Sequence, residues 1–302
     1  MSTMRIAPNV QEALDRNQAV VALESTIITH GMPFPHNVET ARTVEDEVRH
    51  QGAVPATIAV LDGVLHIGLD DAQLEGLGQA QDVMKLSRAD FAYAMANGRN
   101  GSTTVAATMM AARMAGIDVF ATGGIGGVHR GAELSFDVSA DLLELARTDV
   151  IVVCAGAKAI LDLPKTLEVL ETHGVSVIGY QCDELPAFWS RQSGLAAPLR
   201  LDSPAEICRH AKMRRDLQIS GGTLIANPIP PESEIPANII NSYIETALAA
   251  AETEKVSGKD VTPYLLSKIV DLSDGESLQA NIALITNNAR LAAQIAVELA
   301  KN

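Results

Sequence analysis

Two residues of the sequence lie in apolar surroundings that could change their chemistry. Glu24 follows the apolar run 19–23, and Lys158 lies in the segment VIVVCAGAKAIL (150–161), where no other residue from 151 to 161 carries a charge. Burial disfavours the charged form of either side chain. A carboxyl with a raised pKa can act as a general acid, and a neutral lysine amine can form an imine with a carbonyl. A surface carboxylate and a snorkelling lysine are the alternative interpretations.

The segment TGGIGGVHR (122–130) is rich in glycine and ends in His129 and Arg130. Four glycines within five residues allow backbone amides to approach a ligand closely. No Gly-Lys-Ser/Thr follows, so this is not a Walker loop, and His129 stands where a dinucleotide fingerprint requires its last glycine. The segment therefore predicts a ligand loop of another kind, with a flexible loop as the alternative.

Asp137 and Asp141 are four residues apart in a helix-like segment, so we expect them on one helix face. Like charges at this spacing destabilise a helix by roughly a few tenths of a kcal/mol unless something compensates. A hard divalent cation held mainly through water is one remedy. An acidic helix start is the alternative, because negative charge is favoured there.

Other polar residues are less decisive. Lys85 and Arg88 form a small basic island in the segment KLSRAD (85–90), which could hold a phosphate or be solvated surface. Asn281 could cap a helix or recognise the edge of a base. The sequence leaves these alternatives open.

The expected secondary structure places the most unusual residues at one edge of a sheet. Glu24 follows the strand 19–23, Gly123 follows the strand 118–122, and Lys158 lies just after the strand 150–154. Ligands gather at the carboxyl ends of strands in open parallel sheets. We therefore expect one shared pocket.

Strands alternate with helices along most of the chain, which predicts right-handed βαβ crossovers, a largely parallel sheet and a single α/β domain over 1–302. Further expected elements are a helix after Pro35, a hairpin 57–69 with a type I′ turn at Asp62-Gly63, helices 105–115, 138–147 and 164–173, strands 175–180 and 222–227, and helices 235–254, 261–272 and 279–299, with a polar loop at 257–260.

Composition narrows the class of protein. Hydrophobic residues make up 47% and aromatics only 3%, which suits parallel strands of small aliphatic residues covered by helices. A net charge of −14 argues against binding nucleic-acid polymers, although a small anionic substrate is compatible with it. Three scattered cysteines favour a reducing compartment. Without an apolar signal core or membrane-length run, we expect a cytoplasmic protein with no membrane contact.

Several segments together resemble the pseudouridine-5′-phosphate glycosidase family, also called indigoidine-synthase-A-like proteins. The matching stretches are LESTIITHGMPFPHN (23–37), KLSRAD (85–90), NGSTTVAATM (100–109), TGGIGGVHRG (122–131), FDVSADL (136–142), CAGAKAILDLPKTLE (154–168) and SLQANIALITNNA (277–289). They occur in family order over most of the chain. Ala89 stands where the family pattern would have arginine, which puts phosphate affinity in question rather than the chemistry.

The resemblance implies a three-layer α/β/α fold, a homotrimer and a Mn²⁺-dependent or other divalent-metal-dependent enzyme. Its reaction would be the reversible conversion of pseudouridine 5′-phosphate and water into uracil and ribose 5-phosphate. The resemblance assigns the proton donor, the nucleophile and the metal ligand to Glu24, Lys158 and Asp137. It assigns substrate contacts to Lys85, Val105, His129, Ser139, Ala140, Asp141 and Asn281.

These residue types suit that reaction, because pseudouridine joins ribose to uracil through a carbon–carbon bond. Simple departure of the base, as in ordinary glycosidases, would leave a poor carbanion. An imine between C1′ and Lys158 gives an electron sink, and Glu24 can protonate the departing carbon. A lysine-imine lyase of the aldolase type and a nucleotide-binding regulatory module are the alternatives; the latter has no need of both residues.

Overall fold

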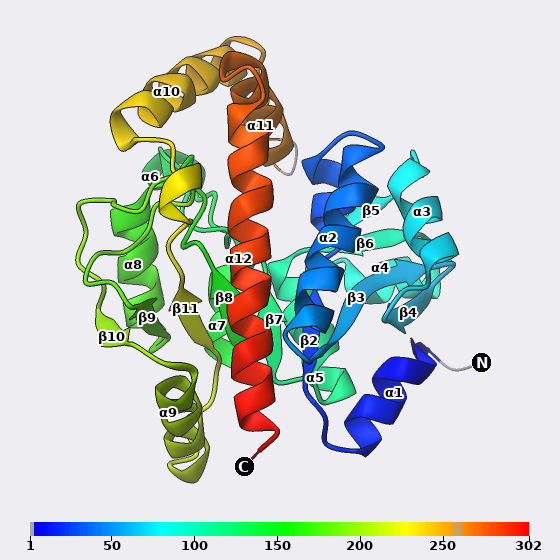
Figure 1. Cartoon of the computed structure of the whole chain (residues 1–302). Helices are drawn as coiled ribbons and strands as arrows, with labels where there is room; N and C mark the ends of the chain where they lie inside the picture. Colours follow the sequence, from blue (N-terminus) through cyan, green and yellow to red (C-terminus); the bar gives the residue numbers. More distant parts are fainter. Residues whose placement is uncertain (1–2, 257, 259–260, 302) are drawn as a thin grey trace.

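The computed structural model describes residues 3–256, 258 and 261–301. Within them, one eleven-stranded sheet forms the centre of the molecule, in the order β1-β4-β3-β2-β7-β8-β11-β9-β10, with β6 beside β3 and β5 beside β6 (Figure 1). The strands are β1 Met4–Ile6, β2 Val20–Leu23, β3 Val54–Leu61, β4 Val64–Ile67, β5 Met84–Leu86, β6 Gly101–Thr103, β7 Val119–Ala121, β8 Ile151–Cys154, β9 Ser176–Tyr180, β10 Leu199–Leu201 and β11 Thr223–Ala226.

The sheet is mostly parallel, and its central strands are buried. The strands β2, β7, β8 and β11 contain only buried residues, as expected where helices cover both faces of a parallel sheet. Among the paired strands described, the two antiparallel pairings both involve β3, with β4 and with β6. The predicted hairpin is confirmed: β3 and β4 are joined by Asp62 and Gly63, both with positive φ.

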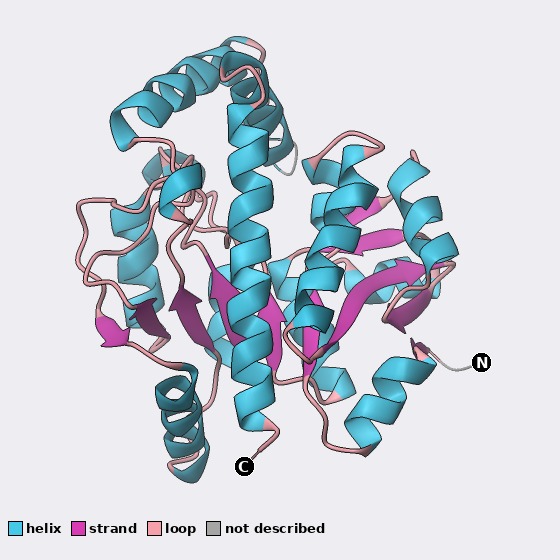
Figure 2. Ribbon diagram, viewed as in Figure 1, coloured by secondary structure: helices cyan, strands magenta, loops and turns pink. Residues whose placement is uncertain are grey.

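Helices cover both faces of the sheet (Figures 1 and 2). They are α1 Pro8–Asp15, α2 His36–His50, α3 Asp71–Gln79, α4 Phe91–Ala96, α5 Val105–Ala115, α6 Ala132–Ser135, α7 Ala140–Arg147, α8 Leu163–Thr172, α9 Pro204–Asp216, α10 Ala237–Thr253, α11 Val261–Leu272 and α12 Glu276–Leu299, with a π-helix η1 Ile27–Gly31 and a 3₁₀-helix η2 Pro231–Ser233. The predicted three-layer α/β/α arrangement with a mixed, largely parallel sheet is therefore confirmed.

The long helix α12 crosses the front of the sheet between α2 and α9 and packs on β2, β7 and β8. Its buried face includes Ala289, Ala292 and Ala293, whose small side chains let the helix lie close to the strands. On the opposite face, α5 and α7 pack against each other. The low aromatic content is thus explained by close helix–sheet packing with small residues.

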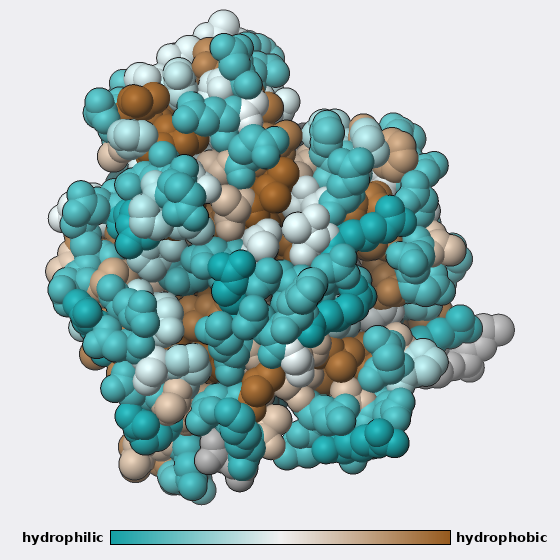
Figure 3. Space-filling view, viewed as in Figure 1, coloured by the Kyte–Doolittle hydropathy of each residue, from teal (hydrophilic) through white to brown (hydrophobic). Residues whose placement is uncertain are grey.

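The chain order around β2 and β7 sets the place of the site. From β2 the chain continues to its neighbour β3 on one side, whereas β7 leads to β8 on the other side. The strand order therefore reverses between β2 and β7, and such a point leaves a crevice at the carboxyl ends of the strands. The front surface is mostly hydrophilic, with small apolar patches scattered between the helices (Figure 3).

Two predictions concern parts of the molecule outside this core. Of the loop predicted at 257–260, residues 257, 259 and 260 lie outside the described part of the chain. No helix among the described residues is long and apolar enough to cross a membrane. The cytoplasmic location and the single domain over 1–302 stay predictions.

Candidate active site

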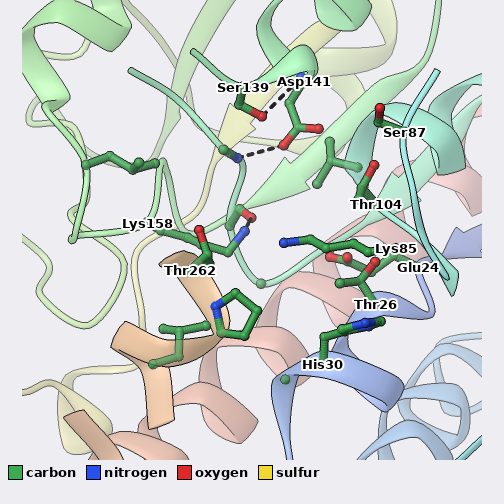
Figure 4. Close-up of a pocket in the computed structure, with 18 of the residues that line it drawn as sticks. Glu24, Thr26, His30, Lys85, Ser87, Thr104, Ser139, Asp141, Lys158 and Thr262 are labelled. Atoms are coloured by element: carbon green, nitrogen blue, oxygen red, sulfur yellow. Dashed lines mark hydrogen bonds between the residues drawn. The ribbon is translucent and has the colours of Figure 1, made fainter. Parts of the chain in front are cut away.

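A cavity of about 350 Å³ lies at the carboxyl ends of β2, β7 and β8. All ten candidate residues line it: Glu24, Lys85, Val105, His129, Asp137, Ser139, Ala140, Asp141, Lys158 and Asn281. In Figure 4, Lys85, Glu24, Thr26 and His30 approach from one side of the cavity, and Lys158 and Thr262 from the other. The structure therefore brings the predicted residues into a single pocket.

Glu24 is held where β2 ends. The next residue, Ser25, donates its hydroxyl to the carbonyl of Ile58 (2.6 Å), and Thr26 donates to the carbonyl of Thr103 (2.7 Å), so the chain is fixed to β3 and β6. Glu24 Oε1 accepts a hydrogen bond from the Thr122 hydroxyl. Burial raises the pKa of the Glu24 carboxyl, and the charge of Lys158 and the bond from Thr122 oppose that rise. A carboxyl with a raised pKa can act as a general acid.

Lys158 is positioned by the glycine-rich segment after β7. Its Nζ donates to the carbonyl oxygen of Gly124 (2.7 Å), and its backbone N–H donates to the Ile125 carbonyl (3.1 Å). These two hydrogen bonds join the segments after β7 and β8 and hold the lysine amine at the cavity wall. A glycine is required at 156 because its φ is +86° and a Cβ there would lie 2.3 Å from the Pro186 carbonyl oxygen.

Asp141 is a buried carboxylate that ties two parts of the site together. Its Oδ1 accepts from the backbone N–H of Ala106 (2.9 Å) in the first turn of α5, and its Oδ2 accepts from that of Gly126 (2.8 Å). Only 6% of the surface of Asp141 is exposed. Asp141 therefore fixes the glycine-rich segment against the start of α5.

Asp137 lies in a different environment, so the prediction that it shares a helix face with Asp141 is wrong. Helix α7 begins at Ala140 because Ser139 acts as the N-cap, its hydroxyl accepting from the N–H of Asp141 (3.2 Å). Asp137 precedes the helix. Its side chain is 41% exposed at the cavity, and its Oδ2 lies 3.9 Å from Nδ1 of His129.

The donor set beside Asp137 limits the kind of metal it could hold. Within the described residues no group of three or more His, Cys, Asp or Glu side chains could hold a metal ion. One exposed carboxylate fits a hard ion that keeps most of its waters, such as Mg²⁺ or Mn²⁺, and does not fit a protein cage. Burial lowers the pKa of His129, with the charge of Asp137 opposing this, which favours the neutral imidazole that metals bind.

The two residues of the basic island, Lys85 and Arg88, have different surroundings in the structure. Lys85 lies in β5 and lines the cavity. Arg88 instead forms a bidentate ion pair with Glu144, at 2.6 Å from Nε and 2.6 Å from a terminal nitrogen. Since Glu144 is 1% exposed, the guanidinium balances a buried charge. Lys85 is thus the member of the island that lines the cavity.

Several lining residues were not found from the sequence. Thr26 and His30 belong to the segment after β2, so their place after a buried strand was a usable signal. Thr104 is the N-cap of α5. Phe188 lies well beyond the end of β9 in the sequence, and its N–H donates to the carbonyl of Ala155 (2.9 Å), directly after β8. Thr262, Pro263 and Leu266 come from α11, whose packing against η1 gives no local signal in the sequence.

Comparison with known proteins identifies relatives that cover nearly the whole chain. Residues 9–298 match the family model described as indigoidine synthase A like protein. The chain is 64% identical to the pseudouridine-5′-phosphate glycosidase of Dinoroseobacter shibae over 99% of this chain and 98% of the relative. It is 62% identical to the protein of the same name from Paracoccus denitrificans, covering 98% of both chains.

Two solved structures share the fold. The prealnumycin C-glycosynthase AlnA, solved in complex with ribulose 5-phosphate, superimposes with a TM-score of 0.92 at 37% identity, over 100% of this chain and 98% of that one. An indigoidine synthase A-like protein from Thermotoga maritima gives a TM-score of 0.89 at 32% identity, over 99% of this chain and 97% of that one.

Proposed function

The chain belongs to the indigoidine synthase A-like family, and we propose that it reversibly cleaves the carbon–carbon glycosidic bond of pseudouridine 5′-phosphate. The products are uracil and ribose 5-phosphate. One observation carries the proposal: Glu24, a carboxyl with a raised pKa, lines the same cavity as the lysine amine of Lys158. An acid and an amine nucleophile are the two groups that this bond requires.

The reaction begins at C1′ of the substrate. The amine of Lys158 bonds to C1′ in its unprotonated form, the bond from C1′ to the ring oxygen breaks, and that oxygen takes the proton that the amine loses, which opens the ribose ring. The nitrogen lone pair then forms the C1′=N imine while the bond from C1′ to C5 of uracil breaks. The bonding pair leaves with C5 of uracil, and the nitrogen lone pair supplies the electrons that C1′ loses.

Glu24 completes the cleavage by protonating C5 of the departing uracil. Its raised pKa keeps the proton available at higher pH than an exposed glutamate would. Water then hydrolyses the imine to the aldehyde of ribose 5-phosphate. The proton released as the neutral amine of Lys158 is freed restores the acid.

The substrate phosphate is proposed to lie near Lys85, in an otherwise acidic protein of net charge −14. AlnA was solved with a pentose 5-phosphate bound, which supports a sugar-phosphate site in this fold. Val105, Ser139, Ala140 and Asn281 are proposed substrate contacts because they line the same cavity. The hydrogen bonds of Asp141 to Ala106 and Gly126 favour an organising role for that side chain.

A divalent cation, Mn²⁺ or a similar ion, is proposed to bind at Asp137, with His129 beside it. Such an ion would supply positive charge next to substrate oxygens. Asp137 would hold it, and the backbone N–H of His129, which donates to the Asp137 carbonyl (3.0 Å), keeps the two residues together.

The protein is also proposed to be a homotrimer. Leu134 and Phe136 are 90% and 85% exposed and belong to the segment that leads to Asp137. Large apolar side chains exposed together are of the kind that assemblies bury. Static light scattering should give three times the monomer mass of 31.9 kDa. A monomeric mass at assay concentration contradicts the trimer.

Release of uracil from pseudouridine 5′-phosphate tests the activity. Chromatography should detect uracil and ribose 5-phosphate with the wild type and divalent cation, and neither product with Lys158→Ala. Uridine 5′-phosphate, whose base is joined through nitrogen, is the matched control substrate. Binding of pseudouridine 5′-phosphate without turnover would instead indicate a regulatory module, and cleavage of only other sugar phosphates would indicate an aldolase-type lyase.

A further inference from the structure

Thr122 is a buried residue behind Glu24 that lies outside the candidate set. It is fully buried, follows β7 directly, and is not one of the described residues that line the cavity. Its hydroxyl donates a hydrogen bond to Oε1 of Glu24. Thr122 therefore reaches the acid from the protein side and acts on substrate only through that carboxyl.

The position of Thr122 is fixed by a buried amide on α12. Nδ2 of Asn288 donates to the carbonyl oxygens of Thr122 (2.9 Å) and Gly123 (3.3 Å). Oδ1 of Asn288 accepts from Nδ2 of Asn227 (3.1 Å), which follows β11. Asn288 is fully buried, and its amide oxygen and nitrogen both have partners. A satisfied buried network of this kind holds a single geometry.

We propose that Thr122 is a positioning residue that fixes the acid proton of Glu24 on Oε2, the oxygen that does not accept from the threonine. In a neutral carboxyl one oxygen is the carbonyl acceptor and the other carries the hydrogen. A donor aimed at Oε1 favours the form in which Oε1 is the carbonyl. As far as catalysis is concerned, this inference rests on the proposed role of Glu24 as the acid.

The hydrogen bond from the Thr122 hydroxyl to Oε1 of Glu24 persists after proton transfer. When Oε2 gives its proton to carbon, the electron pair of the O–H bond stays on the carboxylate, and Oε1 still accepts from Thr122. A hydrogen bond to the charged form stabilises it, so the threonine opposes the effect of burial on the pKa of Glu24. Thr122 thus sets both the location of the proton and the ease of its departure.

Thr122→Val tests the proposal, because valine keeps the shape and lacks the hydroxyl. Thr122→Ser is the matched control that keeps the donor, and Thr122→Ala replaces the valine variant if valine disturbs folding. We expect Thr122→Val to lower kcat about three- to tenfold at low pH and to move the upper limb of the pH–rate profile to higher pH. Thr122→Ser should restore both. An unchanged profile, or a shift to lower pH, would overturn the proposal, the latter because it would make Thr122 the acceptor.

A second measurement separates this inference from the proposed reaction. Difference infrared spectroscopy can follow the C=O stretch of the protonated carboxyl during a pH titration, and loss of the band in Glu24→Gln assigns it. The titration midpoint should rise in Thr122→Val and return in Thr122→Ser. This result requires no substrate, so it stands even if pseudouridine 5′-phosphate is not cleaved. A midpoint independent of Thr122 overturns the inference even where cleavage is observed.

Discussion

Replacement of Asp141 by asparagine should destabilise the protein, whereas the same change at Asp137 should not. Asp141 accepts backbone hydrogen bonds on both oxygens, from Ala106 and Gly126, and is buried. Asparagine offers one oxygen and one NH₂ group, so one of these amides would face a donor. A buried amide left without an acceptor costs about 1–3 kcal/mol, and a bond to a charged acceptor is itself worth about 1.5–3 kcal/mol. Because the two ranges describe the same lost bond and overlap, we expect a loss of about 2–4 kcal/mol.

Thermal unfolding of Asp141→Asn and Asp137→Asn measures this difference. At roughly 2–3 °C per kcal/mol for a chain of this size, Asp141→Asn should lower the Tm by about 4–12 °C. Asp137, half-exposed beside the cavity, should lose no more than about 0.5 kcal/mol. Equal losses in Tm for the two variants would refute the assignment of Asp141 as a structural link between α5 and the glycine-rich segment.

The pH–rate profile of Asp141→Asn tests the effect of the Asp141 charge on the pKa of Glu24. The negative charge of Asp141 raises the pKa of Glu24, so its removal should lower that pKa. An acid works only while protonated, and the rate falls as the pH passes its pKa. The upper limb of the profile should therefore move to lower pH. A shift to higher pH would contradict the electrostatic part of the reasoning.

Three further predictions follow from the site. Glu24→Gln keeps the size of the side chain but cannot deliver a proton, so kcat should fall by about two to four orders of magnitude while substrate binding, measured by calorimetry, persists; near-normal turnover would remove Glu24 from the chemistry. Asp137→Ala should lose activity that excess Mn²⁺ partly restores, and full activity of the wild type in chelator would contradict the metal role. Free pseudouridine should be turned over far more slowly than its 5′-phosphate, and Lys85→Met should narrow that difference; equal kcat/KM for both substrates would exclude the phosphate contact.

Local sequence patterns predicted much of the fold because the signals were strong and short-ranged. Helix α5 ends where Gly116 adopts a positive φ, and the β3–β4 hairpin turns at Asp62-Gly63, both as predicted. The short strands β5 and β6 were missed, since three residues are too few for a periodic pattern. β6 pairs with β3 and β5 pairs with β6, and these pairings depend on residues far away in the sequence.

The candidate site was predicted through position rather than through detailed contacts. The carboxyl-end rule brought Glu24, Gly123 and Lys158 to one edge before the sheet order was known. The contrast between Asp137 and Asp141 could not be predicted, because it depends on where α7 begins and on amides of other elements. The ion pair between Arg88 and Glu144 could not be predicted either, because the two residues meet only in the tertiary structure.

Trapping of the proposed imine tests the central claim most directly. Borohydride added to the wild type with ribose 5-phosphate should reduce the imine to a secondary amine, and mass spectrometry should find it on the peptide that contains Lys158. Lys165, an exposed lysine paired with Glu133, provides the control: Lys165→Arg should be labelled as the wild type is. Lys158→Arg should be neither labelled nor active, because arginine stays protonated. A label on another lysine, or activity in Lys158→Arg, would contradict the mechanism.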